Sequence, residues 1–178
     1  MNFSFSIIDA CEFAAEKHKY QRRKGYLRIP YINHPIKVCK LIVDCGETET
    51  DLLLAAILHD TIEDTNTLAP DISERYGDEV ANIVLEVTDN MKLSEKERKE
   101  LQVSKASGLS RNAKIIKIAD KICNMNDILN YPLFWSRKRK LKYFTWSYRV
   151  FEGCKMVNTE LDAIFMDVYN KGIEAFSK

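Results

Sequence analysis

The chain has 178 residues, of which 46% are hydrophobic and 30% are charged, and its formal net charge is +1. This length suits one compact domain over residues 1–178, with enough apolar side chains to form a core without disulfides or a structural metal. The balanced charge gives no overall argument for binding nucleic acid or a membrane. No apolar run approaches the ~20 residues that span a bilayer, and the N-terminus shows no signal pattern.

The five cysteines are an odd number and form no C-x-x-C pair. Four of them lie among apolar helical neighbours, where a free thiol behaves as a small hydrophobic side chain. This pattern favours a reducing compartment, and we therefore expect a cytoplasmic protein. The cysteines are Cys11, Cys39, Cys45, Cys123 and Cys154.

Apolar residues recur at helical spacing along almost the whole chain, and no segment alternates as a strand would. Pro35 suits the first turn of a helix, and Gly46 and Gly77 suit helix ends. The sequence therefore predicts an all-α fold, a bundle of about eight to ten helices. The predicted helices cover residues 4–20, 35–46, 48 through the acidic cluster described next, 70–76, 79–88, 95–104, 113–129, 139–153 and 158–176.

Four groups suited to metal binding or proton transfer lie in the six residues from His59 to Asp64, directly after the apolar run Leu52–Ile57. On a continuous helix at about 100° per residue, these four groups fall on one face and the hydrocarbon side chains on the other. The carboxylates of Asp60, Glu63 and Asp64 repel one another, which destabilises the helix unless a cation lies among them. The cluster therefore predicts a metal site.

Two other segments carry groups that can complete such a site. His34 precedes Pro35 at the start of a helix, and Asp120 is an acid inside an apolar helix, where a carboxylate needs a cation or several donors to stay ionised. Asn124 lies one turn further along the same face. Nitrogen and oxygen ligands without thiolate suit Mn²⁺, Fe²⁺ or catalytic Zn²⁺ and argue against a closed structural zinc site. The predicted ligands are His34, His59, Asp60 and Asp120.

Each predicted ligand has an alternative structural role, as a helix cap, a histidine packed before a proline or a buried ion-pair partner. Glu63 and Asp64 can be solvated acids at a helix end, although carboxylates are unfavourable at a helix C-terminus. The basic run Arg22–Lys24 can be an exposed loop, as most basic runs are. His18 is expected to pack beside the pocket instead of binding metal.

Three spaced segments resemble the HD-domain hydrolases of the guanosine alarmones (p)ppGpp, and most closely the stand-alone small alarmone hydrolases, including their metazoan form. A bare His-Asp pair is weak evidence for this family, whereas three motifs in the right order are specific. The likeness runs from about residue 10 to the end of the chain. The segments are Tyr31-Ile-Asn-His34-Pro35, Ala55-Ala-Ile-Leu-His59-Asp60-Thr-Ile-Glu63-Asp64-Thr65 and Lys117-Ile-Ala-Asp120-Lys-Ile-Cys-Asn124-Met125.

The resemblance implies an enzyme, a guanosine-3′,5′-bis(diphosphate) 3′-diphosphatase, that hydrolyses the 3′-diphosphate of (p)ppGpp to GDP or GTP and pyrophosphate. It implies one Mn²⁺ per chain, with Zn²⁺ or Fe²⁺ as substitutes, held by the four ligands named above. The acids that match Glu63 and Asp64 activate and orient the attacking water in that family. Nucleotide contacts are implied for Arg23, Lys24, Tyr31, Asn124 and Tyr143, although Tyr143 can equally be a core residue.

One position departs from the family pattern. The family usually has an arginine two positions beyond the motif asparagine, where this chain has Asn126, and that arginine is thought to help bind the substrate. A phosphohydrolase acting on another nucleotide, such as the 2′-phosphate of NADPH, is therefore an alternative, and a nucleotide-binding regulator without turnover is a second. Intact Glu63 and Asp64 argue against the regulator. In every case the expected partner is a small nucleotide, with neither nucleic acid nor membrane, and the sequence leaves the oligomeric state open.

Overall fold

The computed structural model describes residues 3–25 and 27–177, which form helices joined by loops, with one isolated antiparallel bridge between Arg22 and Pro30. The predicted all-α fold is confirmed. None of these helices has the length and apolar character needed to cross a membrane. That residues 1–178 form one domain stays a prediction. The helices are α1 (Phe3–Lys17), α2 (Asn33–Asp44), α3 (Thr50–Leu58), α4 (Thr61–Asp64), α5 (Ala69–Tyr76), α6 (Asp78–Val87), α7 (Glu95–Lys105), the 3₁₀ helix η1 (Ala106–Gly108), α8 (Arg111–Asn130), α9 (Arg137–Cys154) and α10 (Thr159–Ser177).

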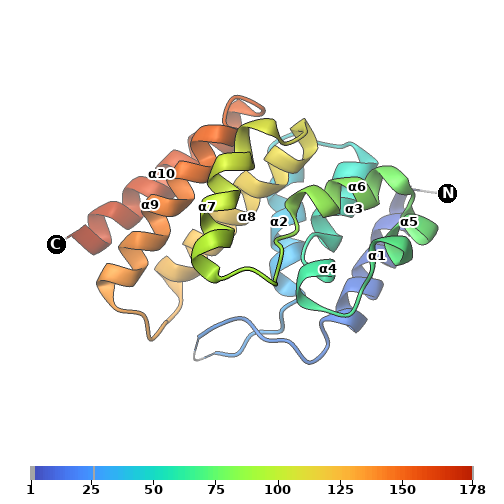
Figure 1. Ribbon diagram of the computed structural model, residues 1–178, viewed down its shortest axis with the longest axis horizontal. Coiled ribbons are helices and arrows are strands. Elements are labelled where there is room, and N and C mark those ends of the chain that lie inside the picture. Colours follow the sequence, from blue (N-terminus) through green and yellow to red (C-terminus); the bar gives the residue numbers. More distant parts are fainter. Residues whose placement is uncertain (1–2, 26, 178) are drawn as a thin grey trace.

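Helix α8 occupies the middle of the molecule and packs against α2, α6, α9 and α10 (Figure 1). The Ser110 hydroxyl begins α8 by accepting a hydrogen bond from the Ala113 N–H, which satisfies one of the free donors of the first turn. Most side chains along α8 are buried, including Ile116 and Ile122. Asp120, in the middle of this helix, is therefore held among buried side chains inside the protein.

Helix α3 ends at Leu58, earlier than the continuous helix predicted through the acidic cluster. His59 and Asp60 form a turn, and a separate short helix, α4, follows from Thr61 to Asp64. The Thr61 hydroxyl donates to the Leu58 carbonyl at 2.7 Å, so a side chain takes over an acceptor at the helix end. The helical wheel drawn through the cluster is therefore wrong beyond Leu58, and the turn sets the direction of the polar side chains.

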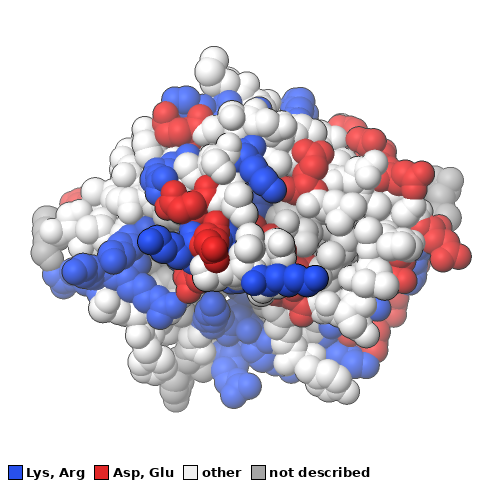
Figure 2. All heavy atoms as spheres, in the orientation of Figure 1, with Lys and Arg blue, Asp and Glu red and all other residues white. Residues whose placement is uncertain are grey.

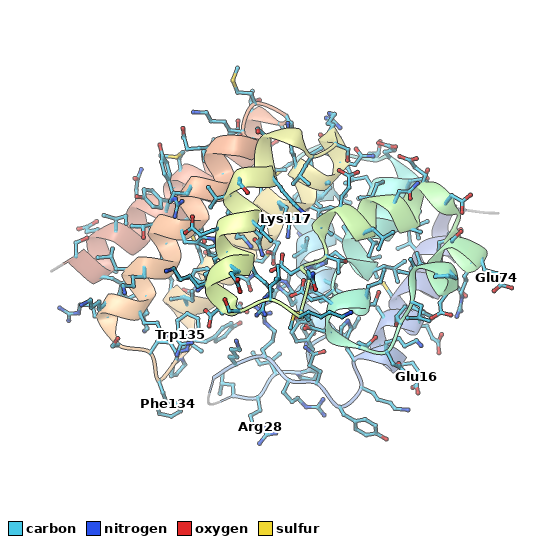
Figure 3. All side chains as sticks on the ribbon, viewed as in Figure 1. Glu16, Arg28, Glu74, Lys117, Phe134 and Trp135 are labelled. Atoms are coloured by element: carbon cyan, nitrogen blue, oxygen red, sulfur yellow. The ribbon has the colours of Figure 1, made fainter. Side chains whose placement is uncertain are left out.

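Two loops lie side by side at the lower edge of the view in Figure 1, one between α1 and α2 and one between α8 and α9. They approach at Gly25, whose φ of +123° favours glycine and whose Cα faces the side chain of Leu133 and the carbonyl of Pro132. Arg28 and Phe134 extend from these loops toward solvent (Figure 3). The two loops form one rim around the functional site described below.

The packing of α10 against α9 depends on Gly172, because a Cβ atom built there overlaps the ring of fully buried Phe144. We expect Gly172→Ala to lower the free energy of unfolding, because overpacking costs about 1–3 kcal/mol. Because the Phe144 ring is rigid, we expect an overpacking cost at the upper end of this range. That cost exceeds the ~1 kcal/mol that alanine gains over glycine in helix propensity. Urea denaturation measures the change. Gly108→Ala, with nothing within 4 Å of the new Cβ, is the control and is expected to change stability by less than about 0.5 kcal/mol.

Candidate metal centre

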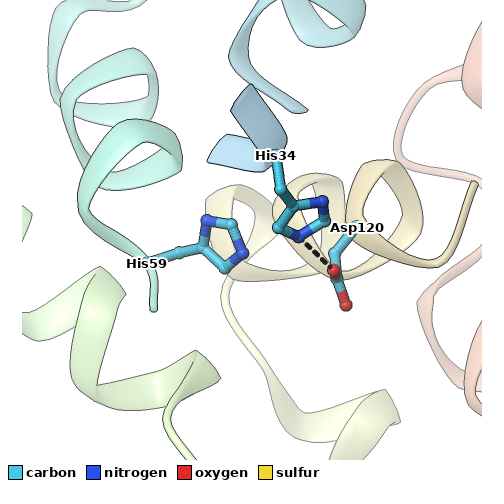
Figure 4. Close-up of side chains that lie close together, drawn as sticks. All are labelled: His34, His59 and Asp120. Atoms are coloured by element: carbon cyan, nitrogen blue, oxygen red, sulfur yellow. Dashed lines mark hydrogen bonds and ion pairs between the residues drawn. The ribbon is translucent and has the colours of Figure 1, made fainter. Parts of the chain in front are cut away.

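Three segments that are distant in the sequence bring imidazole and carboxylate groups together. His34 comes from the first turn of α2, His59 from the turn after α3, and Asp120 from the middle of α8 (Figure 4). One potential ligand atom from each of these residues lies within 4.8 Å of the other two. His34 Nε2 is 3.0 Å from Asp120 Oδ1. This group can accept one divalent cation with only small movements of the side chains.

Asp60 adds a second carboxylate beside the two imidazoles. Its Oδ2 lies 3.0 Å from His59 Nε2 and 3.7 Å from His34 Nε2. His59 Nδ1 bonds the Ala56 carbonyl at 2.8 Å, so this nitrogen carries the proton in neutral histidine. His59 Nε2 is buried and has no hydrogen-bond partner despite the nearby oxygen. The Nε2 electron pair and the carboxylate repel each other unless a proton or a metal ion lies between them, so the donor set fits a metal ion that takes the place of the proton.

Neighbouring donors hold both carboxylates. The Tyr31 hydroxyl donates to Asp60 Oδ2 at 2.8 Å. The Lys121 ammonium donates to Asp120 Oδ2 at 3.0 Å, and the Asn124 amide donates to Asp120 Oδ1. Such outer contacts usually fix the orientation of metal ligands. Tyr31 and Asn124, which the resemblance predicts to contact nucleotide, therefore bond the carboxylates and also line the pocket described below.

The charges of this cluster depend strongly on one another. Burial lowers the pKa of His59, but the carboxylates of Asp60 and Asp120 outweigh burial and raise it to about 9. Burial raises the pKa of Asp60, yet the His59 imidazole holds it below its ordinary value. The same holds for Asp120, where burial is outweighed first by Lys121 and then by His34. The cluster thus favours two ionised carboxylates facing positive charge.

The two remaining acids of the cluster lie beside this group on the pocket wall. Glu63 is partly buried, and its Oε2 accepts the Asp89 N–H at 2.9 Å. Burial raises the pKa of Glu63, and the Asp89 N–H opposes part of this rise. Asp64 is more exposed, and its Oδ2 accepts a hydrogen bond from Gln21 Nε2 at 2.7 Å. A carboxylate with a raised pKa is suited to accept a proton near neutral pH.

A polar pocket of about 660 Å³ opens beside these acids and extends toward the rim loops and the start of α9. Lys and Arg side chains gather over the lower part of the face shown in Figure 2. The acidic end of the pocket shares Asp60 and Glu63 with the small cavity that His34, His59 and Asp120 line, and the other end is basic and aromatic, where phosphates and a base fit. Its lining includes Arg22, Arg23, Lys24, Asp60, Glu63, Asp64, Arg98, Lys99, Trp135, Arg139, Lys142, Tyr143 and Trp146.

The side chains predicted to contact substrate all lie on this pocket wall. The Arg23 guanidinium donates to Asp127 Oδ2 at 2.9 and 3.1 Å and also to Asn124 Oδ1, and it lies 5.3 Å from the Tyr31 ring centre. Lys24 is exposed at the rim. The Tyr143 ring packs against the rings of Trp135 and Trp146. Tyr143 is thus both a packing residue and part of the pocket wall.

Neither His18 nor the cysteines join the cluster of imidazoles and carboxylates. His18 is buried with its ring 4.9 Å from that of Tyr31. All five cysteines are free thiols, and the group of nearby ligand atoms in the described residues contains none of them. The site is therefore built from nitrogen and oxygen alone.

Comparison with known proteins agrees with this geometry. Residues 10–140 match the family model for the HD domain. The chain belongs to the HD-domain family. Members of this family that are hydrolases bind a divalent metal, and this HD domain has a suitable His and Asp group.

Individual relatives place the chain in a narrower group of HD-domain proteins. It is 46% identical over 167 residues to guanosine-3′,5′-bis(diphosphate) 3′-pyrophosphohydrolase MESH1 of Xenopus tropicalis. This alignment covers 90% of the present chain and 93% of the Xenopus protein. MESH1 of Homo sapiens is 40% identical, with 93% of each chain covered. The fold also matches a solved structure described as a metazoan ortholog of SpoT that hydrolyzes ppGpp, with a TM-score of 0.90, 35% identity and 93% and 94% of the two chains covered. The chain belongs with these small HD-domain proteins.

Sequence reasoning missed several residues of this HD-domain pocket. Asp127 follows Asp120 and Asn124 on the same face of α8, so helical spacing was a signal that could have found it. Lys121 is buried next to Asp120, with its ammonium 4.5 Å from the Trp146 ring centre, and a lone lysine in an apolar helix gave a weaker signal. Gln21 contacts Asp64 across 43 positions of sequence, and no local pattern predicts that contact.

Proposed function

We propose that this HD-domain protein hydrolyses the 3′-diphosphate of guanosine-3′,5′-bis(diphosphate), releasing pyrophosphate, with one bound Mn²⁺. The observation that carries the proposal is the His34, His59 and Asp120 group. It lines a small cavity that shares Asp60 and Glu63 with the larger pocket, whose other end is basic and aromatic. The names of the MESH1 relatives give the same reaction for proteins that align along almost the whole chain.

His34, His59, Asp60 and Asp120 would hold the metal ion. A divalent ion at this position would lower the pKa of water and polarise a phosphoryl oxygen. The absence of thiolate among the donors supports Mn²⁺, with Fe²⁺ or Zn²⁺ as substitutes. Tyr31 and Lys121 keep the two carboxylates in place through the hydrogen bonds described above.

The reaction itself needs a proton acceptor and positive charge around the phosphates. Water attacks the phosphorus atom bonded to the 3′ oxygen, the bond between that oxygen and phosphorus breaks, and pyrophosphate forms while the 3′ oxygen gains a proton. Glu63 and Asp64 lie where they can accept the proton of the attacking water, a role worth about 10²- to 10⁴-fold in rate. Arg23 and Lys24 supply positive charge that binds and orients the phosphates.

Asn126 supports a second candidate substrate. A neutral side chain replaces the arginine that the family usually has at this position. This part of α8 lines the pocket with Asn124, Asp127 and Ile128, so the missing charge lies outside the pocket lining. Removal of one cation weakens the preference for a substrate with two diphosphate groups. The second candidate reaction is release of the 2′-phosphate of NADPH as orthophosphate.

The two reactions give different products, so one assay separates them. Purified protein is stripped with EDTA, reloaded with Mn²⁺, Zn²⁺ or Fe²⁺, and incubated with ppGpp or NADPH while pyrophosphate and orthophosphate are measured separately. We expect pyrophosphate from ppGpp with Mn²⁺ and no turnover in EDTA, because the ligands alone cannot activate water. Orthophosphate from NADPH without pyrophosphate from ppGpp would favour the second candidate, and turnover in EDTA would contradict both.

A further inference from the structure

Asp64 depends on another side chain for its orientation. It ends the four-residue helix α4 and is exposed at the edge of the pocket. Glu63, in contrast, is fixed by the backbone N–H of Asp89. An exposed carboxylate populates several rotamers unless a partner selects one of them. The hydrogen bond from Gln21 Nε2 to Asp64 Oδ2, at 2.7 Å, supplies that selection.

The Gln21 amide is itself oriented by a buried histidine. His18 Nδ1 lies 2.6 Å from Gln21 Oε1, and the imidazole is only 2% exposed. With the proton on Nδ1, His18 donates to the amide oxygen, and the amide nitrogen must then face Asp64. The reverse orientation would place the amide oxygen against a carboxylate oxygen, where two acceptors repel. His18 therefore selects the orientation in which Gln21 donates to Asp64.

The same segment also holds a predicted metal ligand. The Tyr31 N–H donates to the Gln21 carbonyl at 3.1 Å, and the Gln21 N–H donates to the His18 carbonyl at 2.8 Å. The Tyr31 hydroxyl in turn donates to Asp60. Two parts of this loop, bonded to each other between Gln21 and Tyr31, thus contact Asp60 through Tyr31 and Asp64 through Gln21. The loop fixes the distance between the metal side and the proton-accepting side of the site.

We propose that Gln21 is a positioning residue that aims the Asp64 carboxylate. Its Nε2–H occupies Asp64 Oδ2 and leaves Oδ1 to take the proton of the attacking water. This inference rests on the proposed function, because it needs Asp64 to act on water. It assigns Gln21, with His18 behind it, to catalysis by orientation and not to metal or substrate binding.

The test is a double-mutant cycle between Gln21 and Asp64, with ppGpp and saturating Mn²⁺. Gln21→Met keeps the length of the side chain and removes the donor, and we expect kcat to fall about 10- to 100-fold. KM, Mn²⁺ affinity and the melting temperature should change little. Lys19→Met is the control, because the ammonium of this exposed lysine in the same turn contacts Glu16 and the exposed Tyr20 ring and no residue of the site among the contacts that the structure describes, and it should match wild type.

The second arm of the cycle measures Gln21→Met in an Asp64→Asn background under single-turnover conditions. If Gln21 acts through Asp64, the double variant is no slower than Asp64→Asn alone. Multiplied losses in the double variant, or a Gln21→Met enzyme as fast as wild type, would overturn the inference. Wild-type protein that leaves ppGpp intact would instead overturn the proposed function, so the two failures are distinguishable.

Discussion

Replacing His59 with alanine is expected to remove both Mn²⁺ binding and hydrolysis of ppGpp. The imidazole supplies a buried, unpartnered Nε2 next to Asp60, and no other described side chain can take its place in the group with His34 and Asp120. Loss of one of the four predicted ligands also removes the imidazole that faces Asp60. The free enzyme should therefore bind Mn²⁺ too weakly to be retained through gel filtration.

Metal content by mass spectrometry and the rate of pyrophosphate release are the two measurements for this variant. Circular dichroism shows whether His59→Ala is folded, and Asp120→Asn, which keeps the shape of the side chain, repeats the test if it is not. Exposed Asn33, in the same α2 turn as His34, provides the control variant Asn33→Ala, which should keep metal and activity. A His59→Ala enzyme that turned over ppGpp at the wild-type rate would contradict the assigned mechanism.

The second large effect is expected for Glu63→Gln, which should keep Mn²⁺ and lose activity. The amide has the same shape as the carboxylate but cannot accept the proton of water, so kcat should fall about 10²- to 10⁴-fold. Burial raises the pKa of Glu63, which makes the wild-type carboxylate a better base near neutral pH. Retained metal with lost turnover separates this role from that of His59.

The matched control for Glu63→Gln is Glu74→Gln, because Glu74 lies exposed on α5, far from the pocket (Figure 3). Its metal content and kcat should equal those of wild type. Simultaneous loss of metal in Glu63→Gln would reassign Glu63 to metal binding. Unchanged kcat would leave Asp64 as the proton acceptor by itself.

The sequence predicted the helical fold, and it singled out most of the groups that the structure brings together in the candidate site, for clear physical reasons. Helical periodicity is a local property, and Pro35, Gly46 and Gly77 mark helix starts and ends directly. Asp120 stood out because a carboxylate in an apolar helix needs partners, and the structure supplies them in His34, Lys121 and Asn124. Such conflicts between a polar group and its apolar surroundings are visible without a structure.

Contacts between distant segments were not predictable in the same way. The break of α3 after Leu58 depends on the Thr61 hydroxyl, which ends a helix that apolar spacing alone would continue. The bond of Gln21 to Asp64 and that of Arg23 to Asp127 join residues far apart in the chain. Their formation depends on how the helices and loops pack, which periodicity does not specify.

The most direct test of the metal centre is anomalous diffraction at the manganese edge from crystals of the wild-type protein grown with Mn²⁺. We predict one strong anomalous peak per chain, within coordination distance of His34, His59, Asp60 and Asp120. No peak in this cluster, or a peak elsewhere with these four side chains turned apart, would contradict the account.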